Sequence, residues 1–311
     1  MDAKYTLELA NADDAPYALA ASPAFARDGV CFAACGSGLY RSQNGGASWE
    51  LLRASAEAVT TAVAVSPAYA EDRSVFAAVK GGILRSSDGG ERWFTAGFPA
   101  PPPVFSSLIV SPDFERDGCL LAGALEDGVF SSTDRGARWQ PWNFGLFDLN
   151  TLCLALSPKW TEDETAYAGT ETGLYRSTNG GRAWRHSGFP SELAPALSLA
   201  CFEDGRDGSS RLLVGTENSG LLASGDHGET WEQVGEDVIS EAVNQLHVAH
   251  DAKGGHSLYV LTNDGVIHSD DEGRSWSDLV RVDGIPTAML PLCGLMLLGV
   301  QGKGVMRLPR D

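Results

Sequence analysis

One short segment recurs along the whole chain at nearly constant spacing. It reads Gly-Leu-Tyr-Arg-Ser in its clearest copies, and a Gly-rich turn and a tryptophan follow. Its leading residues are Gly38, Gly82, Gly128, Gly173, Gly220, Gly265 and Gly304. These glycines are 44, 46, 45, 47, 45 and 39 residues apart, and each interval holds several short apolar runs. A period of about 45 residues with such runs predicts one small four-stranded sheet per repeat.

Each of the first six periods contains four predicted strands, A to D in chain order. With the seventh period, the pattern predicts an all-β, seven-bladed β-propeller with four-stranded antiparallel blades. The A strands are expected at Tyr17–Ala21, Val59–Val65, Ser107–Val110, Leu152–Leu156, Leu197–Cys201, Val243–Val248 and Thr287–Leu290. Strand D is expected to open at the tryptophan, for example Trp93. Between strands A and B, four copies of Ser-Pro-x-aromatic-x-x-Asp predict an acidic turn.

The seventh period has runs at Leu295–Val300 and Val305–Leu308 but no strand D. A strand at about residues 5–9 is left over at the other end of the chain. We expect it to complete the last blade, at about residues 285–311, and so to close the ring of one domain over residues 1–311. Six blades with an appendage are the alternative.

The composition restricts the classes of partner. Acidic residues outnumber basic ones, 41 to 23, so the net charge is −18. Nucleic acid and anionic lipid are therefore unexpected partners, because both bind through lysine and arginine. No apolar run is long enough to span a membrane, and no membrane insertion is expected. The first residues lack the pattern of a signal peptide, and the six cysteines read as free buried thiols, so we expect a cytoplasmic protein.

Six copies of Ser-x-Asp/Asn-x-Gly-x-x-Trp link the predicted C and D strands. They are Ser42, Asn44, Gly46 and Trp49; Ser86, Asp88, Gly90 and Trp93; Ser132, Asp134, Gly136 and Trp139; Ser177, Asn179, Gly181 and Trp184; Ser224, Asp226, Gly228 and Trp231; and Ser269, Asp271, Gly273 and Trp276. The pattern resembles the Asp-box, or BNR repeat. Its side chains are expected to bond nearby backbone N–H groups, so we assign it a structural role. The calcium-loop spacing is absent, and neither a metal nor a cofactor is expected.

Asp-box propellers include sialidases, xyloglucan-cleaving hydrolases, sortilin-type receptors and proteins like the photosystem II stability/assembly factor. A sialidase needs an arginine triad on its inner strands, and the predicted A strands contain no arginine. The Ser-Pro-x-aromatic-x-x-Asp and Gly-Leu-Tyr-Arg-Ser segments and the Gly-Phe-Pro linkers between blades look most like those of the assembly-factor-like group. This resemblance implies a non-catalytic scaffold that binds another protein. The basic patch expected of photosynthetic members is missing here.

Two sets of residues are candidates for a site on the face formed by the D–A and B–C loops. Glu126, Glu171 and Glu217 occupy similar points in three B–C loops and could act as acid and base in glycoside hydrolysis. A carbohydrate-active protein, either a hydrolase or a glycan-binding lectin, is therefore the alternative function. Polar decoration of equivalent turns is the simpler interpretation.

Three successive D–A loops are rich in aromatic residues and proline. Their candidate partner-binding residues are Phe98, Pro102, Phe105, Trp142, Phe144, Phe147 and Phe189. An apolar patch bordered by acidic residues is suited to protein docking. Alternatively, the same aromatic rings fold back and pack as local core.

Overall fold

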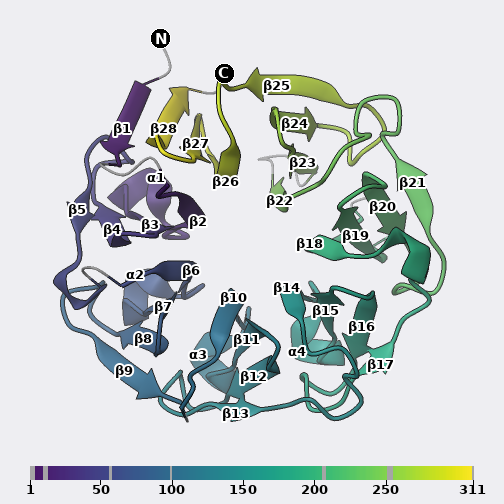
Figure 1. Ribbon diagram of the computed structural model, residues 1–311, viewed down its shortest axis with the longest axis horizontal. Helices are drawn as coiled ribbons and strands as arrows, with labels where there is room; N and C mark the ends of the chain where they lie inside the picture. The colour runs from purple at the N-terminus through teal and green to yellow at the C-terminus, as the bar shows by residue number, and fades with distance from the viewer. Residues whose placement is uncertain are drawn as a thin grey trace. The chain divides into compact units, whose positions relative to one another are not determined.

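The fold is described for residues 4–9, 13–55, 58–98, 100–204, 208–250 and 255–309 of a computed structural model. The described strands form seven four-stranded sheets. Figure 1 shows the strands of each sheet side by side. The predicted class, an all-β, seven-bladed β-propeller with antiparallel blades, is confirmed.

The blades are numbered in chain order, and their strands A to D follow the sequence in blades 1 to 6. Blades 1 to 3 comprise β2 (Pro16–Ala21), β3 (Cys31–Cys35), β4 (Gly38–Ser42) and β5 (Glu50–Leu51); β6 (Thr60–Val65), β7 (Val75–Val79), β8 (Gly82–Ser86) and β9 (Phe94–Gly97); and β10 (Val104–Val110), β11 (Leu120–Leu125), β12 (Gly128–Ser132) and β13 (Gln140–Pro141). Blades 4 to 6 comprise β14 (Thr151–Leu156), β15 (Ala166–Thr170), β16 (Leu174–Ser177) and β17 (Arg185–His186); β18 (Ala196–Glu203), β19 (Ser210–Thr216), β20 (Leu221–Ser224) and β21 (Glu232–Val234); and β22 (Gln245–His250), β23 (His256–Leu261), β24 (Gly265–Ser269) and β25 (Ser277–Arg281).

Blade 7 joins the two ends of the described chain. It comprises β26 (Pro286–Leu292), β27 (Leu295–Val300), β28 (Gly304–Pro309) and β1 (Lys4–Glu8). Strand β1 runs antiparallel to β28, with Tyr5 opposite Met306, and the buried Leu7 joins a core cluster with Leu19 and Leu297. The N-terminal strand thus completes the last blade, as predicted.

The chain divides into two compact units, one of residues 1–122, 131–140 and 286–311, the other of residues 123–130 and 141–285. In the first unit, β2 packs beside β6 and β26, the A strands of blades 2 and 7. In the second unit, β18 packs beside β14 and β22 in the same way. The organisation of residues 1–311 as one domain stays a prediction.

The B strands are apolar on both faces, as β3 illustrates. Its residues Cys31, Ala33 and Cys35 belong to one core cluster, and Phe32 and Ala34 belong to another. Successive side chains of a strand point to opposite faces, so β3 fills the core on both sides of its blade. This burial explains why the B strands read as continuous apolar runs in the sequence.

The connections between strands A and B differ from the predicted acidic turns. In blades 1 to 4 each contains a single-turn helix: α1 (Phe25–Asp28), α2 (Tyr69–Asp72), α3 (Phe114–Asp117) or α4 (Trp160–Asp163). In blade 2 the Ser66 hydroxyl donates to Asp72 Oδ2 at 2.7 Å and accepts from the Ala68 N–H at 3.1 Å. These local bonds close the helical turn, because serine and aspartate side chains readily bond the nearby backbone. Two 3₁₀ turns, η1 (Arg53–Ser55) and η2 (Ser191–Leu193), precede the A strands of blades 2 and 5.

Candidate functional site

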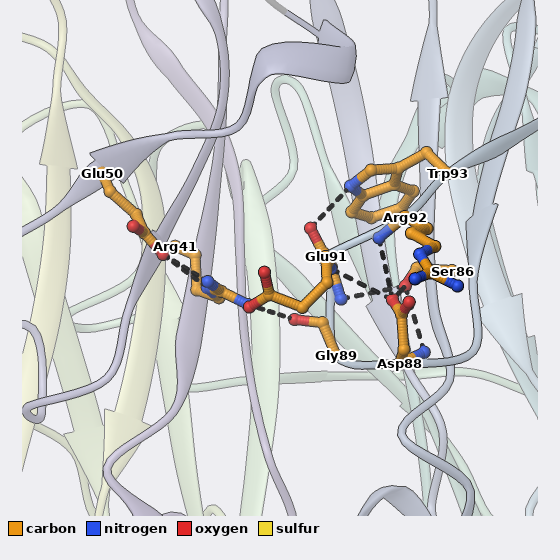
Figure 2. A network of polar contacts seen from close by, with 9 residues as sticks. Arg41, Glu50, Ser86, Asp88, Gly89, Glu91, Arg92 and Trp93 are labelled. Carbon is orange, nitrogen blue, oxygen red and sulfur yellow. Dashed lines mark hydrogen bonds and ion pairs between the residues drawn. The ribbon is translucent and has the colours of Figure 1, made fainter.

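The six Ser-x-Asp/Asn-x-Gly-x-x-Trp segments, here called the repeat turns, connect strands C and D of blades 1 to 6. In blade 2 the Ser86 hydroxyl donates to Asp88 Oδ1 at 2.9 Å and accepts from the Gly90 N–H at 2.9 Å. Asp88 Oδ1 also accepts from the Arg92 N–H at 2.9 Å, as Figure 2 shows. The same three bonds recur in the other five turns. The carboxylate and amide groups of these turns are therefore used within the turn.

These bonds also set the ionisation of the aspartates. A hydrogen bond from the Ser275 hydroxyl, aided by backbone N–H groups, lowers the pKa of Asp271 to about 2. Partial burial raises the pKa of Asp134, but hydrogen bonds from Arg138 and Ser132 outweigh it and lower the pKa to about 2. Carboxyl groups with such pKa values stay ionised at neutral pH and are poor general acids.

The tryptophans of the repeat turns differ in what their indole N–H groups bond. Those of Trp93, Trp231 and Trp276 donate to the glycine carbonyl of their own turn. The Trp184 indole instead donates to the Trp142 carbonyl at 2.8 Å. Trp184 thereby holds a segment that follows the preceding blade and is one of the candidate docking loops.

An ion-pair network joins blade 1 to the repeat turn of blade 2 (Figure 2). Arg41 of β4 is buried, and its Nε donates to Glu50 Oε1 of β5 at 2.7 Å. Its Nη1 donates to the Gly89 carbonyl at 2.8 Å and lies 2.7 Å from Glu91 Oε1. Burial opposes the charge of Arg41, but the hydrogen bonds to Glu91 and Glu50 outweigh it and raise the arginine pKa. The network stabilises the contact between two blades.

The three candidate glutamates are all exposed in B–C loops. Asn150 links two of them, since its Oδ1 accepts from the Glu126 backbone N–H at 3.0 Å and its Nδ2 donates to Glu171 Oε2 at 2.7 Å. Glu217 makes no hydrogen bond or ion pair through its side chain with any of the described residues. The structure thus brings Glu126 and Glu171 to one asparagine and leaves Glu217 apart from that contact. Their proposed catalytic role stays a prediction.

Residues 142–150, here called the aromatic segment, follow the two-residue strand β13. Phe144 forms an isolated parallel bridge with Ala183, and the Trp184 N–H donates to the Phe144 carbonyl at 2.8 Å. The Arg182 guanidinium lies over the Trp142 ring, 5.2 Å from its centre. Trp142 and Phe144 therefore lie beside the residues that lead into β17, while Asn143 between them donates to the Asp127 carbonyl of a B–C loop at 2.9 Å.

The end of the aromatic segment reaches the B–C loops. Asp148 Oδ2 accepts from the backbone N–H and the hydroxyl of Thr172, at 2.8 and 2.7 Å. Burial raises the pKa of Asp148, but these bonds and the Asn150 N–H outweigh it and lower the pKa. Asp148 and Asn150 are not among the predicted site residues. The signal that could have identified them is an Asp-x-Asn pair directly before a strand, because such side chains often bond backbone groups in loops.

Two aromatic rings of this anchored segment are exposed. Phe144 is 81% exposed and Phe147 is 89% exposed, while Trp142 is partly buried. A phenylalanine left in water forgoes roughly 1.5–3 kcal/mol of burial free energy. The segment, held by backbone and side-chain bonds, thus presents two apolar rings to solvent.

The other predicted partner-binding residues are placed differently. Phe105 is 2% exposed, because it lies within β10 and packs on Phe98, with 5.0 Å between ring centres. Phe189 is also 2% exposed and meets the Trp231 ring edge-on at 5.3 Å. Pro102 is exposed. Phe105 and Phe189 therefore serve the core in this conformation and are not available to a partner.

Several further large apolar side chains are exposed that the sequence pattern does not single out. Phe94 in β9 is 66% exposed, and Val104 at the start of β10 is 58% exposed. Nothing in the sequence distinguishes Phe94 from a packed strand residue.

Within the described residues, no group of three or more His, Cys, Asp or Glu side chains is arranged to hold a metal ion. No helix in the described part of the chain is both long and apolar enough to cross a membrane. All six cysteines are free thiols, and Cys293 is exposed where the sequence predicts burial.

No protein-family model and no curated protein matches this sequence. Solved structures do match its fold. The chain is similar to a GH74 xyloglucanase from Xanthomonas campestris, with a TM-score of 0.71 and 19% identity over 98% of this chain and 53% of that one. This chain thus spans about half the length of the xyloglucanase.

Two matches are of nearly equal length to this chain. YCF48 bound to a D1 peptide has a TM-score of 0.68 and 16% identity, over 99% of this chain and 95% of that one. YCF48 from Cyanidioschyzon merolae has a TM-score of 0.67 and 14% identity, over 99% and 98%. At these identities the similarity establishes the β-propeller fold that this chain shares with YCF48 and with a glycoside hydrolase.

Proposed function

We propose that this protein is a non-catalytic scaffold that docks another protein on the aromatic segment. The six repeat turns are, in this proposal, Asp-boxes of an assembly-factor-like propeller. The observation that carries the proposal is the exposure of Phe144 and Phe147 on a segment whose backbone is already held at both ends. A site fixed before binding loses less conformational entropy when a partner arrives.

The surroundings of the two rings define the chemistry of the partner. Glu126, Asp127 and Glu171 are exposed in the B–C loops that the aromatic segment contacts. A protein segment with apolar side chains for the rings and lysine or arginine beside them fits this arrangement. The structural similarity to YCF48 in complex with a D1 peptide is compatible with such a partner. A cytoplasmic location belongs to the same proposal, since free thiols suit a reducing compartment.

The test is quantitative capture of a partner by the purified protein from its native cells, followed by titration of that partner. Replacing both rings, Phe144→Ser with Phe147→Ser, should weaken binding by about a hundredfold, since each ring contributes roughly 1.5 kcal/mol or more. Phe94→Ser is the matched control, because it removes another exposed ring elsewhere. Equal binding by the double variant and the control would contradict the docking site.

A carbohydrate-active protein is the alternative function. The observation in its favour is the link that Asn150 makes between the Glu126 backbone N–H and the Glu171 carboxylate, together with the fold shared with a xyloglucanase. Hydrolysis of polysaccharides that is lost in Glu126→Gln or Glu171→Gln would establish this alternative. Saturable glycan binding without turnover would indicate a lectin.

A further inference from the structure

Arg41 lies on strand C of blade 1, and its ion pairs can be compared with the contacts of the arginine at the equivalent position of strand C in blade 4. Arg41 lies opposite Glu50 on the neighbouring strand of its own blade, and Glu91 comes from the repeat turn of the next blade. One arginine thus meets two carboxylates. The positive charge of Arg41 is therefore compensated by neighbouring carboxylates.

The corresponding position of blade 4, within the second unit, has a different charge pattern. Arg176 of β16 lies opposite Arg185 of β17, so a second arginine stands where blade 1 has a glutamate. Only Glu229, in the repeat turn of blade 5, corresponds to a carboxylate of the blade 1 network. Like charges directly opposite each other on paired strands are destabilising.

The two arginines have no compensating partner among the described residues. The Nε atom of Arg176 is buried and has no hydrogen-bond partner. Neither guanidinium makes an ion pair or a hydrogen bond with any residue in the described part of the chain. A buried donor left unpaired costs free energy, so a ligand that accepts its bond would be favoured.

A cavity of about 310 Å³ lies at this place. Its lining includes Arg176, Thr178, Asn179, Arg185, Ser187 and Glu229. Two guanidinium groups and two hydroxyls are the donors that bind tetrahedral oxyanions, and arginine does so with a planar pair of N–H groups. The cavity carries more positive than negative charge in a chain whose net charge is −18.

We propose that this cavity binds a phosphate-type oxyanion, either free phosphate or the phosphoryl group of a small molecule. The anion lies between Arg176 and Arg185 and takes the place that the Glu50 carboxylate has beside Arg41. It removes the repulsion between the two arginines and satisfies the buried Nε.

The test is isothermal titration of the full-length protein with inorganic phosphate and, separately, with phosphoserine, at constant ionic strength. Saturable binding of at least one of them is expected, and the tighter ligand distinguishes free phosphate from a phosphoryl group on a larger molecule. Arg185→Glu recreates the blade 1 pattern and should weaken binding by about a hundredfold, because it removes one donor and adds a competing carboxylate. Arg53→Glu makes the same charge change at an exposed position of the first unit and should leave binding unchanged.

A second measurement guards against a variant that fails to fold. The midpoint of thermal unfolding should rise with phosphate in the unsubstituted protein and in Arg53→Glu, and it should rise less in Arg185→Glu and Arg185→Gln. Absence of saturable binding by either ligand, or equal binding by folded Arg185→Glu, would overturn the proposal.

Discussion

The serine of each repeat turn accepts a hydrogen bond from a glycine N–H and donates one to the neighbouring carboxylate or amide. In blade 2 this serine is fully buried, and its hydroxyl is the acceptor for the Gly90 N–H. Ser86→Ala should therefore lower the free energy of unfolding by about 1–3 kcal/mol. Ser87→Ala, at the exposed next position, should change it by less than about 0.5 kcal/mol. Urea unfolding of the two variants measures this difference, and equal midpoints would exclude the assigned role of the serine.

The aspartates of these turns predict how stability depends on pH. Asp134 and Asp271 have folded-state pKa values of about 2, below the value of about 3.9 for an unfolded aspartate. A lowered pKa contributes stability that is present above about pH 4 and is lost as the pH falls from about 4 toward 2.

Asparagine provides the comparison for this pH prediction, because Asn44 and Asn179 make the same turn with an amide. Replacing Asp134 and Asp271 with asparagine should keep the turns and reduce the loss of stability between about pH 4 and about pH 2.5. Urea midpoints at these two pH values measure the loss. The same loss in both proteins would contradict the assignment of these carboxylates.

At the same residue scale, the sequence predicted which positions build the repeat turns but not which aromatic rings are free. The turn residues bond within a few positions of one another, so the local pattern reveals them. Phe189 and Phe147 look alike in the sequence, yet Phe189 meets Trp231 from the next blade and Phe147 meets solvent. Burial of this kind depends on residues distant in the sequence, which local patterns do not reveal.

At the scale of the elements, the five-residue strand β1 completes a whole blade. It supplies the fourth strand of blade 7, and its Leu7 packs in the core cluster shared with blade 1. Leu7→Ala should lower the free energy of unfolding by roughly 2–5 kcal/mol, since the site is buried. Glu8→Ala, at an exposed neighbouring position, serves as the control. Equal unfolding midpoints for the two variants would mean that β1 does not stabilise the blade.

Most strands lie within one or two residues of their predicted bounds, because their apolar runs end at glycine, proline or the repeat turn. The D strands begin one residue later than expected, since Trp93 completes its turn by bonding Gly90 before β9 starts at Phe94. The helices α1 to α4 escaped prediction. Each has only four residues, too few for a helical period to appear in the sequence.

On the scale of the whole molecule, stability and binding are assigned to different sets of residues. The repeat turns lie between strands C and D and are closed by their own hydrogen bonds, whereas the aromatic segment presents Phe144 and Phe147 to solvent. Repetition identified the seven blades because blades 1 to 6 use the same turn and the seventh repeats their strand pattern. The candidate docking segment and the Arg176–Arg185 pair were harder to predict, because each is a departure from the repeat.

The central claim is that the repeat turns stabilise the fold while the aromatic segment binds the partner. Titration of the captured partner against two variants tests this claim most directly. Ser86→Ala should be less stable than the unsubstituted protein but bind the partner with unchanged affinity. Phe144→Ser with Phe147→Ser should unfold at the normal urea midpoint but bind about a hundredfold more weakly. The reverse result, with binding lost in Ser86→Ala and kept in the double variant, would contradict a docking function of the aromatic segment.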